Sequence, residues 1–329
     1  MTTYDLDVMV LRGDVTESRH RVHAAVVDAG GDMLGRAGDP DLVTHWRSCA
    51  KPLQVMPLLR SGHADRLGWG DEQIALACAS HGGEPEHVVV VNAMLASLGL
   101  EEGDLACGPH TPLTARGARL LREQGLTASR VHNNCSGKHA AMLALAKGSN
   151  WSILDYQLSD HPVQQAARDT VAEWSGIPAE RILCGVDGCS VVTFALPLSG
   201  MARSFARLAE AARRHDESAA RIVTAMRTNP FLVGGTDRFD TVLMEESGGS
   251  ILAKVGAEGV HTVVLLDEQI GFAVKVEDGS PRAQQPAVLR MLQHLGALPA
   301  TLSPRLETLA RAPVNNTRGE QVGEVRCHA

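Results

Sequence analysis

The stretch His-Asn-Asn-Cys-Ser-Gly-Lys-His (residues 132–139) is followed directly by Ala-Ala-Met-Leu-Ala-Leu-Ala (residues 140–146). Asn side chains can cap the free N–H groups of a first helical turn, so we expect a helix to begin near Asn133 or Asn134. Apolar residues then continue on every face of that helix. The stretch therefore predicts a helix that is buried on all sides.

The same stretch holds side chains that can carry chemistry. Cys135 and Lys138 are three residues apart and would share one face of the helix. We expect the helix N-terminus to lower the pKa of Cys135 and to favour a neutral Lys138. These two groups are potential metal ligands, or a nucleophile and a base. The alternative is a capped core helix with one buried cysteine.

The composition of the 329-residue chain excludes several functional classes. Its net charge is −7, it has no basic run, and only 3% of its residues are aromatic, which argues against nucleic-acid binding. We find no apolar run of transmembrane length and no N-terminal targeting segment, so no membrane association is expected. Seven cysteines, an odd number in mostly apolar or Gly-rich contexts, suit reduced thiols in the cytoplasm.

The order of the expected elements predicts an α+β fold in a single domain spanning residues 1–329. Strands are expected at 6–12, 21–28, 32–36, 181–186, 190–196, 250–255, 260–266 and 271–276, with a hairpin turn at 29–31. Helices are expected at 48–60, 71–79, 85–98, 114–124, 134–147, 160–175, 201–215, 218–228 and 283–295. N- and C-terminal strands would form one sheet subregion, 1–40 and 181–295, packed against a helical subregion, 41–180. After residue 295 we expect a proline-broken segment on the surface.

Residues 47–54, Arg-Ser-Cys-Ala-Lys-Pro-Leu-Gln, contain a Ser-x-x-Lys pattern. Ser48 stands at a helix N-cap position, and Lys51 follows one turn later. A neutral Lys can take the proton of such a Ser hydroxyl, as in Ser-Lys acyl-transfer enzymes. The alternative is a capping Ser with a solvated Lys. Pro52 also disfavours helical geometry at Lys51.

Two further segments carry candidate side chains. Residues 79–87, Ala-Ser-His-Gly-Gly-Glu-Pro-Glu-His, place Ser80 and His81 in a polar loop between helices, although a simple helix–helix turn is the alternative. Lys254 lies in an apolar strand, where an amine must find a partner or lose its proton. It is therefore a candidate base, or else a salt-bridged Lys.

Residues 184–190, Cys-Gly-Val-Asp-Gly-Cys-Ser, form a Gly-bounded turn after an apolar strand. The spacing of its two cysteines does not fit a Cys-x-x-Cys zinc knuckle. Cys189 could still meet Cys135 across the fold, with Asp187 close by. The alternative is a tight turn flanked by small core thiols.

Together these motifs resemble the inducible, thermolabile asparaginases of rhizobia, the third structural class of asparaginase. The resemblance extends from Arg12 to Val325 and includes Gly-Gly-Thr-Asp-Arg-Phe-Asp-Thr (234–241) and Lys-Val-Gly-Ala-Glu-Gly (254–259) besides the motifs above. It implies a fold similar to serine β-lactamases and glutaminases. It also implies an L-asparagine amidohydrolase that releases L-aspartate and ammonia, and a homodimer.

The resemblance assigns roles to particular residues. The implied Ser–Lys pairs are Ser48 with Lys51 and Ser80 with Lys254. Ser48 is expected to attack the side-chain amide, although Ser80 as the nucleophile stays open. The implied Zn²⁺ ligands are Cys135, Lys138 and Cys189, with a water in fourth place and Asp187 beside them. The expected substrate contacts are Arg47, whose guanidinium suits a carboxylate, together with Asp187 and His81.

Two other classes of function are kept open. A β-lactamase-like serine esterase or peptidase would use Ser48 and Lys51, but the chain has no convincing Ser-Asp-Asn or Lys-Thr-Gly partner motif. A zinc- or thiol-based sensor or binding protein would use Cys135 and Cys189, and would leave both Ser–Lys pairs without a role. Ammonia release from asparagine separates these alternatives.

Overall fold

The computed structural model describes residues 1–328, which form an α+β protein as the sequence predicts. The described chain divides into two compact units. Unit 1 comprises Met1–Cys49, Leu196–Arg207 and residues 253–328, and unit 2 comprises Ala50–Ala195 and Leu208–Leu252. These limits differ from the expected subregions, because residues 181–195 and 208–252 belong with the helices rather than with the sheet.

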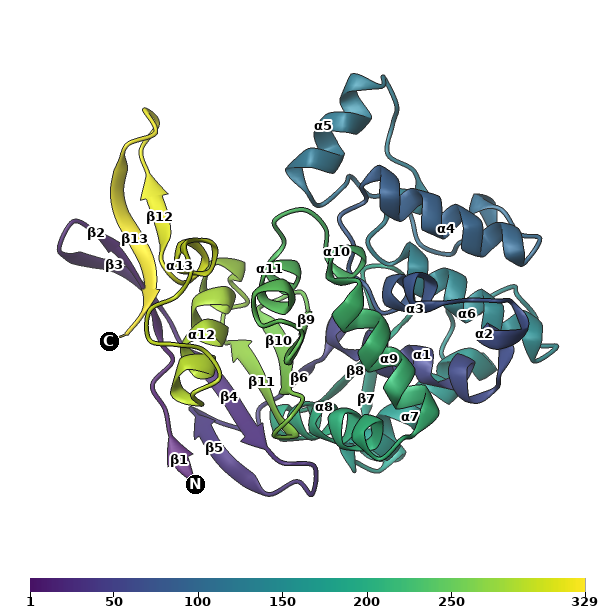
Figure 1. The fold of residues 1–329 in the computed structure, drawn as a ribbon, viewed down its shortest axis with the longest axis horizontal. Coiled ribbons are helices and arrows are strands. Elements are labelled where there is room, and N and C mark those ends of the chain that lie inside the picture. Colours follow the sequence, from purple (N-terminus) through teal and green to yellow (C-terminus); the bar gives the residue numbers. More distant parts are fainter. Residues whose placement is uncertain (329) are drawn as a thin grey trace. The chain divides into compact units, whose positions relative to one another are not determined.

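Unit 1 is built on strands from both ends of the chain (Figure 1). Its larger sheet has the order β1 (Thr2–Thr3), β5 (Met33–Ala37), β4 (Val22–Val27), β11 (Ile270–Val276), β10 (Val260–Leu265) and β9 (Ile251–Val255). β4 and β11 are antiparallel neighbours, with Ala25 opposite Ala273. The predicted assembly of one sheet from N- and C-terminal strands is therefore confirmed, and so is the β4–β5 hairpin.

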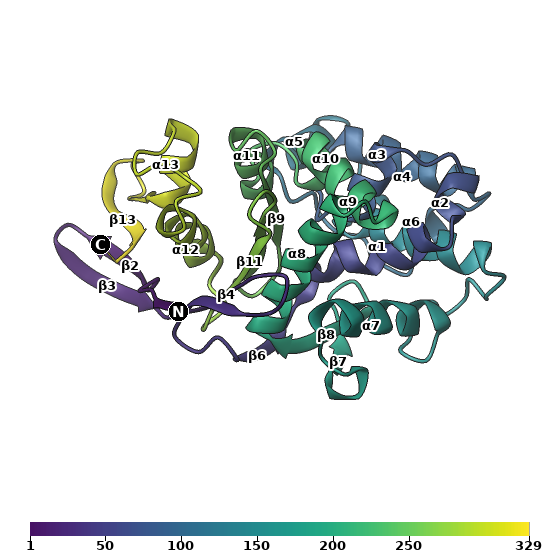
Figure 2. The ribbon, with the colours of Figure 1, turned by 60° about the horizontal axis from the view of Figure 1, so that its bottom comes forward.

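Helices cover the larger sheet on both faces. Figure 2 shows α12 (Pro281–His294) on one side and α8 (Leu198–Arg213) on the other. β4 and β10 are buried along their whole length, which explains why most of their residues are apolar. Burial on both faces also removes water from the surroundings of any polar side chain on these strands.

Of the second sheet of unit 1, the sequence predicted only the strand expected at 6–12, which is β2 (Val8–Arg12). The order of this sheet is β12 (Ala312–Asn315), β13 (Gln321–Cys327), β2 and β3 (Val15–His20). Outside this sheet, α13 (Pro304–Ala310) precedes β12 in the chain, and β6 (Val43–His45) is a short strand of the same unit. The expected surface segment after residue 295 is thus a hairpin paired to the N-terminal strand. β3 is polar and mostly exposed, and β13 is mostly half-buried with Gln, Glu and Arg among its residues, so neither has a strong apolar strand signal.

Unit 2 is mainly helical. Its helices are α1 (Lys51–Arg60), α2 (His63–Arg66), α3 (Asp71–Ala77), α4 (Pro85–Ser97), α5 (Ala115–Glu123), α6 (Ser136–Gly148), α7 (Pro162–Ser175), α9 (Glu217–Thr228), α10 (Pro230–Val233) and α11 (Phe239–Glu246). A hairpin of β7 (Leu183–Val186) and β8 (Val192–Pro197) follows α7. Short 3₁₀ turns are η1 (Arg47–Ala50) at the boundary with unit 1, η2 (Glu102–Asp104), η3 (Arg130–His132) and η4 (Ala179–Arg181).

α6 is the centre of unit 2, as the sequence predicts. Every residue from Ser136 to Ala146 is buried, and α1, α3, α4 and α7 all contact the helix. The predicted start of the helix was wrong, because α6 begins at Ser136 without a capping side chain. Asn133 instead uses its side-chain oxygen to accept the backbone N–H of Cys135 at 2.9 Å.

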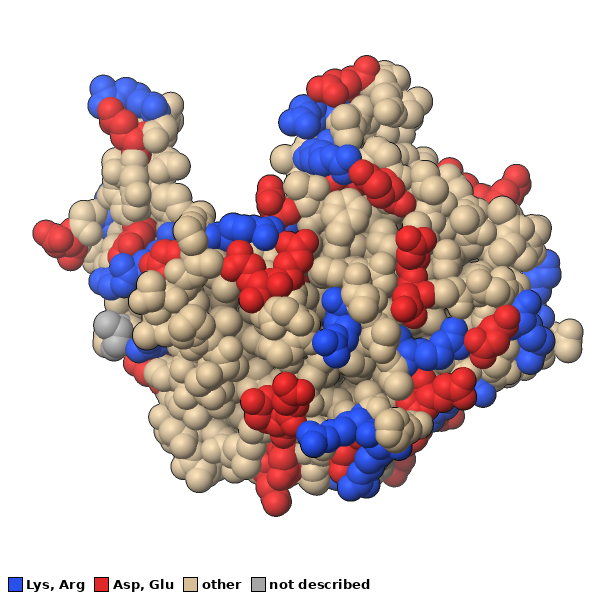
Figure 3. Space-filling view, in the orientation of Figure 1, with Lys and Arg blue, Asp and Glu red and all other residues tan. Residues whose placement is uncertain are grey.

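Within residues 1–328, no helix combines the length and the apolar character needed to cross a membrane. On the face drawn in Figure 3, acidic and basic side chains are interspersed rather than gathered into one extended area of a single sign.

Candidate functional site

Lys51 places a buried amine between two segments of unit 2. It is the first residue of α1, and its side chain is 0% exposed. Its Nζ donates to Ser80 Oγ at 3.1 Å, to the Asn134 carbonyl at 3.1 Å and to the Ala79 carbonyl. The amine therefore joins the Ser80 loop to the residues that precede α6.

Ser48 lies in η1, just before Lys51 in the chain. It is half-buried, and its hydroxyl makes no side-chain hydrogen bond to any residue of the described chain, 1–328. Arg47 has a φ of 53°, a left-handed conformation that is uncommon for a residue other than Gly. The expected conflict at Pro52 does not arise, since α1 begins at Lys51 and Pro is tolerated in a first turn.

Lys254 is buried in β9 of unit 1, and its Nζ donates to the Val255 carbonyl at 3.0 Å. Its own carbonyl accepts a hydrogen bond from Cys49 Sγ at 2.9 Å. Cys49 is the neighbour of Ser48 in η1, so unit 1 brings the Ser48 segment beside the strand that carries Lys254. Both Ser–Lys motifs thus have a buried amine.

Cys135, Lys138 and Cys189 form one buried cluster in unit 2. Lys138 Nζ lies 3.2 Å from Cys189 Sγ, and the Cys135 thiol donates a hydrogen bond to Asn134 Oδ1 at 3.7 Å. The neighbouring Cys135 thiol lowers the pKa of Cys189 to about 5, against the opposing effect of burial. Cys189 and burial together raise the pKa of Cys135 to about 12. The expectation of a lowered Cys135 pKa is therefore wrong.

The protonation expected for Lys138 was also wrong. Burial lowers the pKa of its amine, but the neighbouring Cys189 and Cys135 outweigh burial and raise it. Asp187 contributes in the same direction from the β7–β8 turn. The carboxylate of Asp187 is half-buried and accepts the Gly188 N–H at 2.8 Å.

The cluster fits a zinc ion by its donor atoms. The two sulfurs, together with the Lys138 nitrogen once a bound metal has displaced its proton, match the N/S preference of Zn²⁺ and leave one of four positions open. Among residues 1–328, no group of three His, Cys, Asp or Glu side chains could hold a metal ion, so the set requires the Lys138 amine. Two His side chains flank this segment: His139 Nδ1 binds Tyr156 Oη at 2.7 Å, and His132 Nδ1 binds Ser129 Oγ at 3.0 Å. The buried His139 Nε2 has no hydrogen-bond partner among the described residues.

His81, an expected substrate contact, is a buried ring in unit 2. Its Nε2 bonds Ser136 Oγ at 2.9 Å, and its Nδ1 accepts the Gly83 N–H at 3.1 Å. The ring stacks on His87 with centroids 5.1 Å apart. Burial lowers the pKa of His81 well below its usual value, so the ring is neutral. Both ring nitrogens are occupied, and His81 supports the Ser80 loop.

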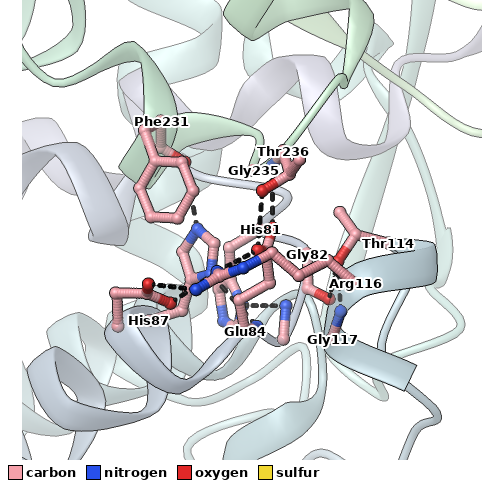
Figure 4. A network of polar contacts seen from close by, with 12 residues as sticks. His81, Gly82, Glu84, His87, Thr114, Arg116, Gly117, Phe231, Gly235 and Thr236 are labelled. Atoms are coloured by element: carbon pink, nitrogen blue, oxygen red, sulfur yellow. Dashed lines mark hydrogen bonds and ion pairs between the residues drawn. The ribbon is translucent and has the colours of Figure 1, made fainter. Parts of the chain in front are cut away.

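Sequence reasoning missed one charged network beside Ser80 (Figure 4). The carboxylate of Glu84 is 0% exposed and binds Thr236 and Arg116. Glu84 and Thr236 both stand in quoted motifs, at 80–87 and 234–241. Nothing in a single sequence shows that two residues separated by 152 positions are partners.

Comparisons with known proteins place this chain among amide hydrolases. The sequence profile of the family described as L-asparaginase II matches residues 8–327. A comparison with curated proteins finds no match. Similar solved structures include a Bacillus glutaminase, with 13% identity, a TM-score of 0.39, and coverage of 84% of this chain and 91% of that one. Another is a β-lactamase from Mycobacterium bovis, with 13% identity, a TM-score of 0.35, and coverage of 84% and 96%.

Proposed function

The chain is an amidohydrolase of the L-asparaginase II family, and from this premise we propose that it hydrolyses L-asparagine to L-aspartate and ammonia. The observation that carries the proposal is the contact between Lys51 Nζ and Ser80 Oγ at 3.1 Å, with both side chains buried. A buried Ser–Lys contact moves protons to and from hydroxyl groups, which amide hydrolysis requires.

We assign the attack to Ser48. Its hydroxyl is half-buried and has no hydrogen-bond partner within residues 1–328, whereas the Ser80 hydroxyl is already held by Lys51. Ser48 Oγ would bond to the side-chain amide carbon while Lys51 takes the hydroxyl proton. The C–N bond would then break as Lys51 passes that proton to the leaving –NH2 group, so that NH3 leaves and an ester to Ser48 remains.

Water completes the reaction by cleaving that ester. Ser80 and Lys254 are proposed to carry the protons of this second step, in which water adds to the ester carbon and the Ser48 hydroxyl is restored. A neutral amine is needed at one stage of this step, to accept a proton from the water.

A zinc ion would be held by Cys135, Lys138 and Cys189. When bound, Zn²⁺ would act as a Lewis acid or hold one group of the substrate in place. The charged ends of L-asparagine need partners as well. Arg47 is proposed to bind the carboxylate, and the half-buried Asp187 to bind the ammonium group or to orient a water of the zinc site.

The purified protein should release ammonia and aspartate in equal amounts from L-asparagine. A parallel assay with L-glutamine would measure the side activity. Assays with a β-lactam and a nitrophenyl ester would test the serine esterase alternative. Ester or β-lactam hydrolysis without ammonia release from asparagine would overturn the proposal. We also propose a cytoplasmic homodimer, which light scattering would detect as twice the chain mass of 35.0 kDa.

A further inference from the structure

Glu84 is a fully buried carboxylate that the proposed reaction does not use. It precedes α4, yet its oxygens reach the distant segment 234–237. Oε1 accepts the backbone N–H of Thr236 at 2.7 Å, and Oε2 accepts the Thr236 hydroxyl at 2.7 Å and the Arg116 guanidinium. Burying a charge is costly unless it is paired and hydrogen-bonded, and here both conditions are met.

The same distant segment also holds the backbone of Ser80. The Ser80 N–H donates to the Val233 carbonyl at 3.1 Å, three residues before Thr236. The loop and the segment are therefore tied at two points, Ser80 to Val233 and Glu84 to Thr236. Between these ties the two backbones touch: a Cβ atom on Gly235 would lie 2.7 Å from Glu84 Oε1 and 3.3 Å from Gly82 Cα.

From this arrangement we infer that Glu84 is a positioning residue for Ser80, which it acts on through Thr236 and the 233–236 segment. The inference rests on the role proposed above for Ser80. The Ser80 hydroxyl is bound on its other side by Lys51, so its place is set by two independent contacts. None of the described hydrogen bonds joins Glu84 to Ser80 or to Lys51.

The hydrogen bonds to Glu84 stabilise its ionised form. Burial alone would raise the pKa of its carboxyl, but the bonds from Arg116 and Thr236 outweigh burial and lower it. Arg116 also binds the exposed carboxylate of Glu86 at 2.6 Å. Glu86 has no bond to the 233–236 segment, so it offers a matched control that shares the same Arg.

The first experiment compares steady-state kinetics of Glu84→Gln, Thr236→Val and Glu86→Gln on L-asparagine. Small displacements of a reacting group cost up to about 10²-fold in rate, so we expect kcat to fall roughly tenfold or more in the first two variants with KM within about threefold. Glu86→Gln should behave as the wild type. Thr236→Ser keeps the hydroxyl and should recover the rate. A normal kcat in Glu84→Gln would overturn the inference.

The second experiment needs no enzyme activity. Hydrogen exchange should show that the Ser80 amide exchanges faster in Glu84→Gln and Thr236→Val, while amides inside α6 keep their protection. Unchanged protection of the Ser80 amide would overturn the inference even if activity falls. Faster exchange in a protein that does not hydrolyse asparagine would support the positioning role and count against the proposed function alone.

A double-mutant cycle separates positioning from general support of the fold. If Glu84 acts through Ser80, Glu84→Gln should cause almost no further loss of rate in a Ser80→Ala background. Losses that multiply would mean that Glu84 acts on something other than Ser80, and would overturn the inference. Thermal unfolding of each variant shows which losses of catalytic rate come from a smaller folded fraction.

Discussion

At the scale of single residues, Lys51 shows what spacing can and cannot predict. The sequence pairs it with Ser48, three positions earlier, but the amine bonds to Ser80, which is 29 positions away. The motif therefore identified a Lys whose amine is buried beside a Ser hydroxyl, but not the Ser that it contacts. The partner of the amine depends on how α1 packs against the loop after α3, and local spacing does not contain that information.

Because Ser48 and Ser80 have different proposed roles, their substitution is expected to have different effects. Ser48→Ala should lower the rate of ammonia release by about 10³-fold or more, because losing an activated nucleophile removes most of the catalysed rate. Its circular dichroism spectrum and melting temperature should stay close to wild type, since the Ser48 hydroxyl has no described partner to lose. Ser61→Ala, at the C-cap of α1, is the matched control and should retain full activity. Near-normal turnover in folded Ser48→Ala would move the nucleophile to Ser80.

A second residue-scale prediction concerns the buried rings of His81 and His87. Burial lowers the pKa of both below the ordinary value of 6.5. Below about pH 6.5 the unfolded chain therefore binds protons that the folded chain does not, so the free energy of unfolding should decrease as pH falls. Above that pH, neither ring contributes a pH dependence.

Urea unfolding between pH 8 and pH 5 checks this sign. His81→Gln keeps a side-chain N–H that can reach Ser136, but it cannot titrate. We expect the loss of unfolding free energy between pH 6.5 and pH 5 to be smaller in this variant than in the wild type. An equally steep loss in both proteins would show that other groups control the pH dependence.

At the scale of elements, apolar patterning predicted the helices and strands that are buried. The burial of α6 on every side followed directly from its sequence, and β4, β10 and β11 followed from their apolar runs. The start of α6 did not follow, because the Asn133 side chain binds the N–H of Cys135 instead of capping the helix. The polar strands β3 and β13 gave no signal, since their stability comes from pairing with neighbours.

Close packing of α3 on α6 leads to a prediction at Gly137. A Cβ atom at this position would lie 2.3 Å from the Leu76 carbonyl oxygen, a contact that backbone atoms cannot relieve without moving apart. Gly137→Ala should therefore reduce the free energy of unfolding by about 1–3 kcal/mol, as overpacking of a core does. Thermal or urea unfolding measures the change.

The matched control for this element is Gly108→Ala. Gly108 is exposed, and a Cβ there would meet nothing within 4 Å. We expect its unfolding free energy to change by less than about 0.5 kcal/mol, as for ordinary surface positions. A Gly137→Ala protein as stable as this control would mean that α3 and α6 can separate at little cost.

At the scale of the whole molecule, the order of elements predicted the α+β class and the sheet shared by both chain ends. It did not predict the division into units. α9 and α11 come between strands in the sequence, yet they belong to unit 2 with the helices. Each has apolar residues that must be buried, but the sequence does not show which element the helix packs against.

The zinc proposal gives the last prediction for the intact molecule. The purified protein should contain one zinc ion per 35.0 kDa chain, measured by inductively coupled plasma mass spectrometry. Cys135→Ser and Cys189→Ser should each lose most of that zinc, and Lys138→Met should bind it less tightly, because each change removes one donor of the set. Cys184→Ser is the control: Cys184 is exposed on β7, and its replacement should leave the zinc content unchanged.

Removal of zinc by a chelator should abolish or strongly reduce ammonia release without unfolding the protein. The fold does not depend on the ion in the way a zinc finger does, because α6 is buried by its own apolar residues and Lys138 already lies 3.2 Å from the Cys189 sulfur. Circular dichroism should therefore keep its helical signal after chelation, with a lower melting temperature. Full retention of zinc by Cys135→Ser, or loss of zinc only in a His139 variant, would contradict this ligand set and leave the Ser–Lys chemistry unaffected.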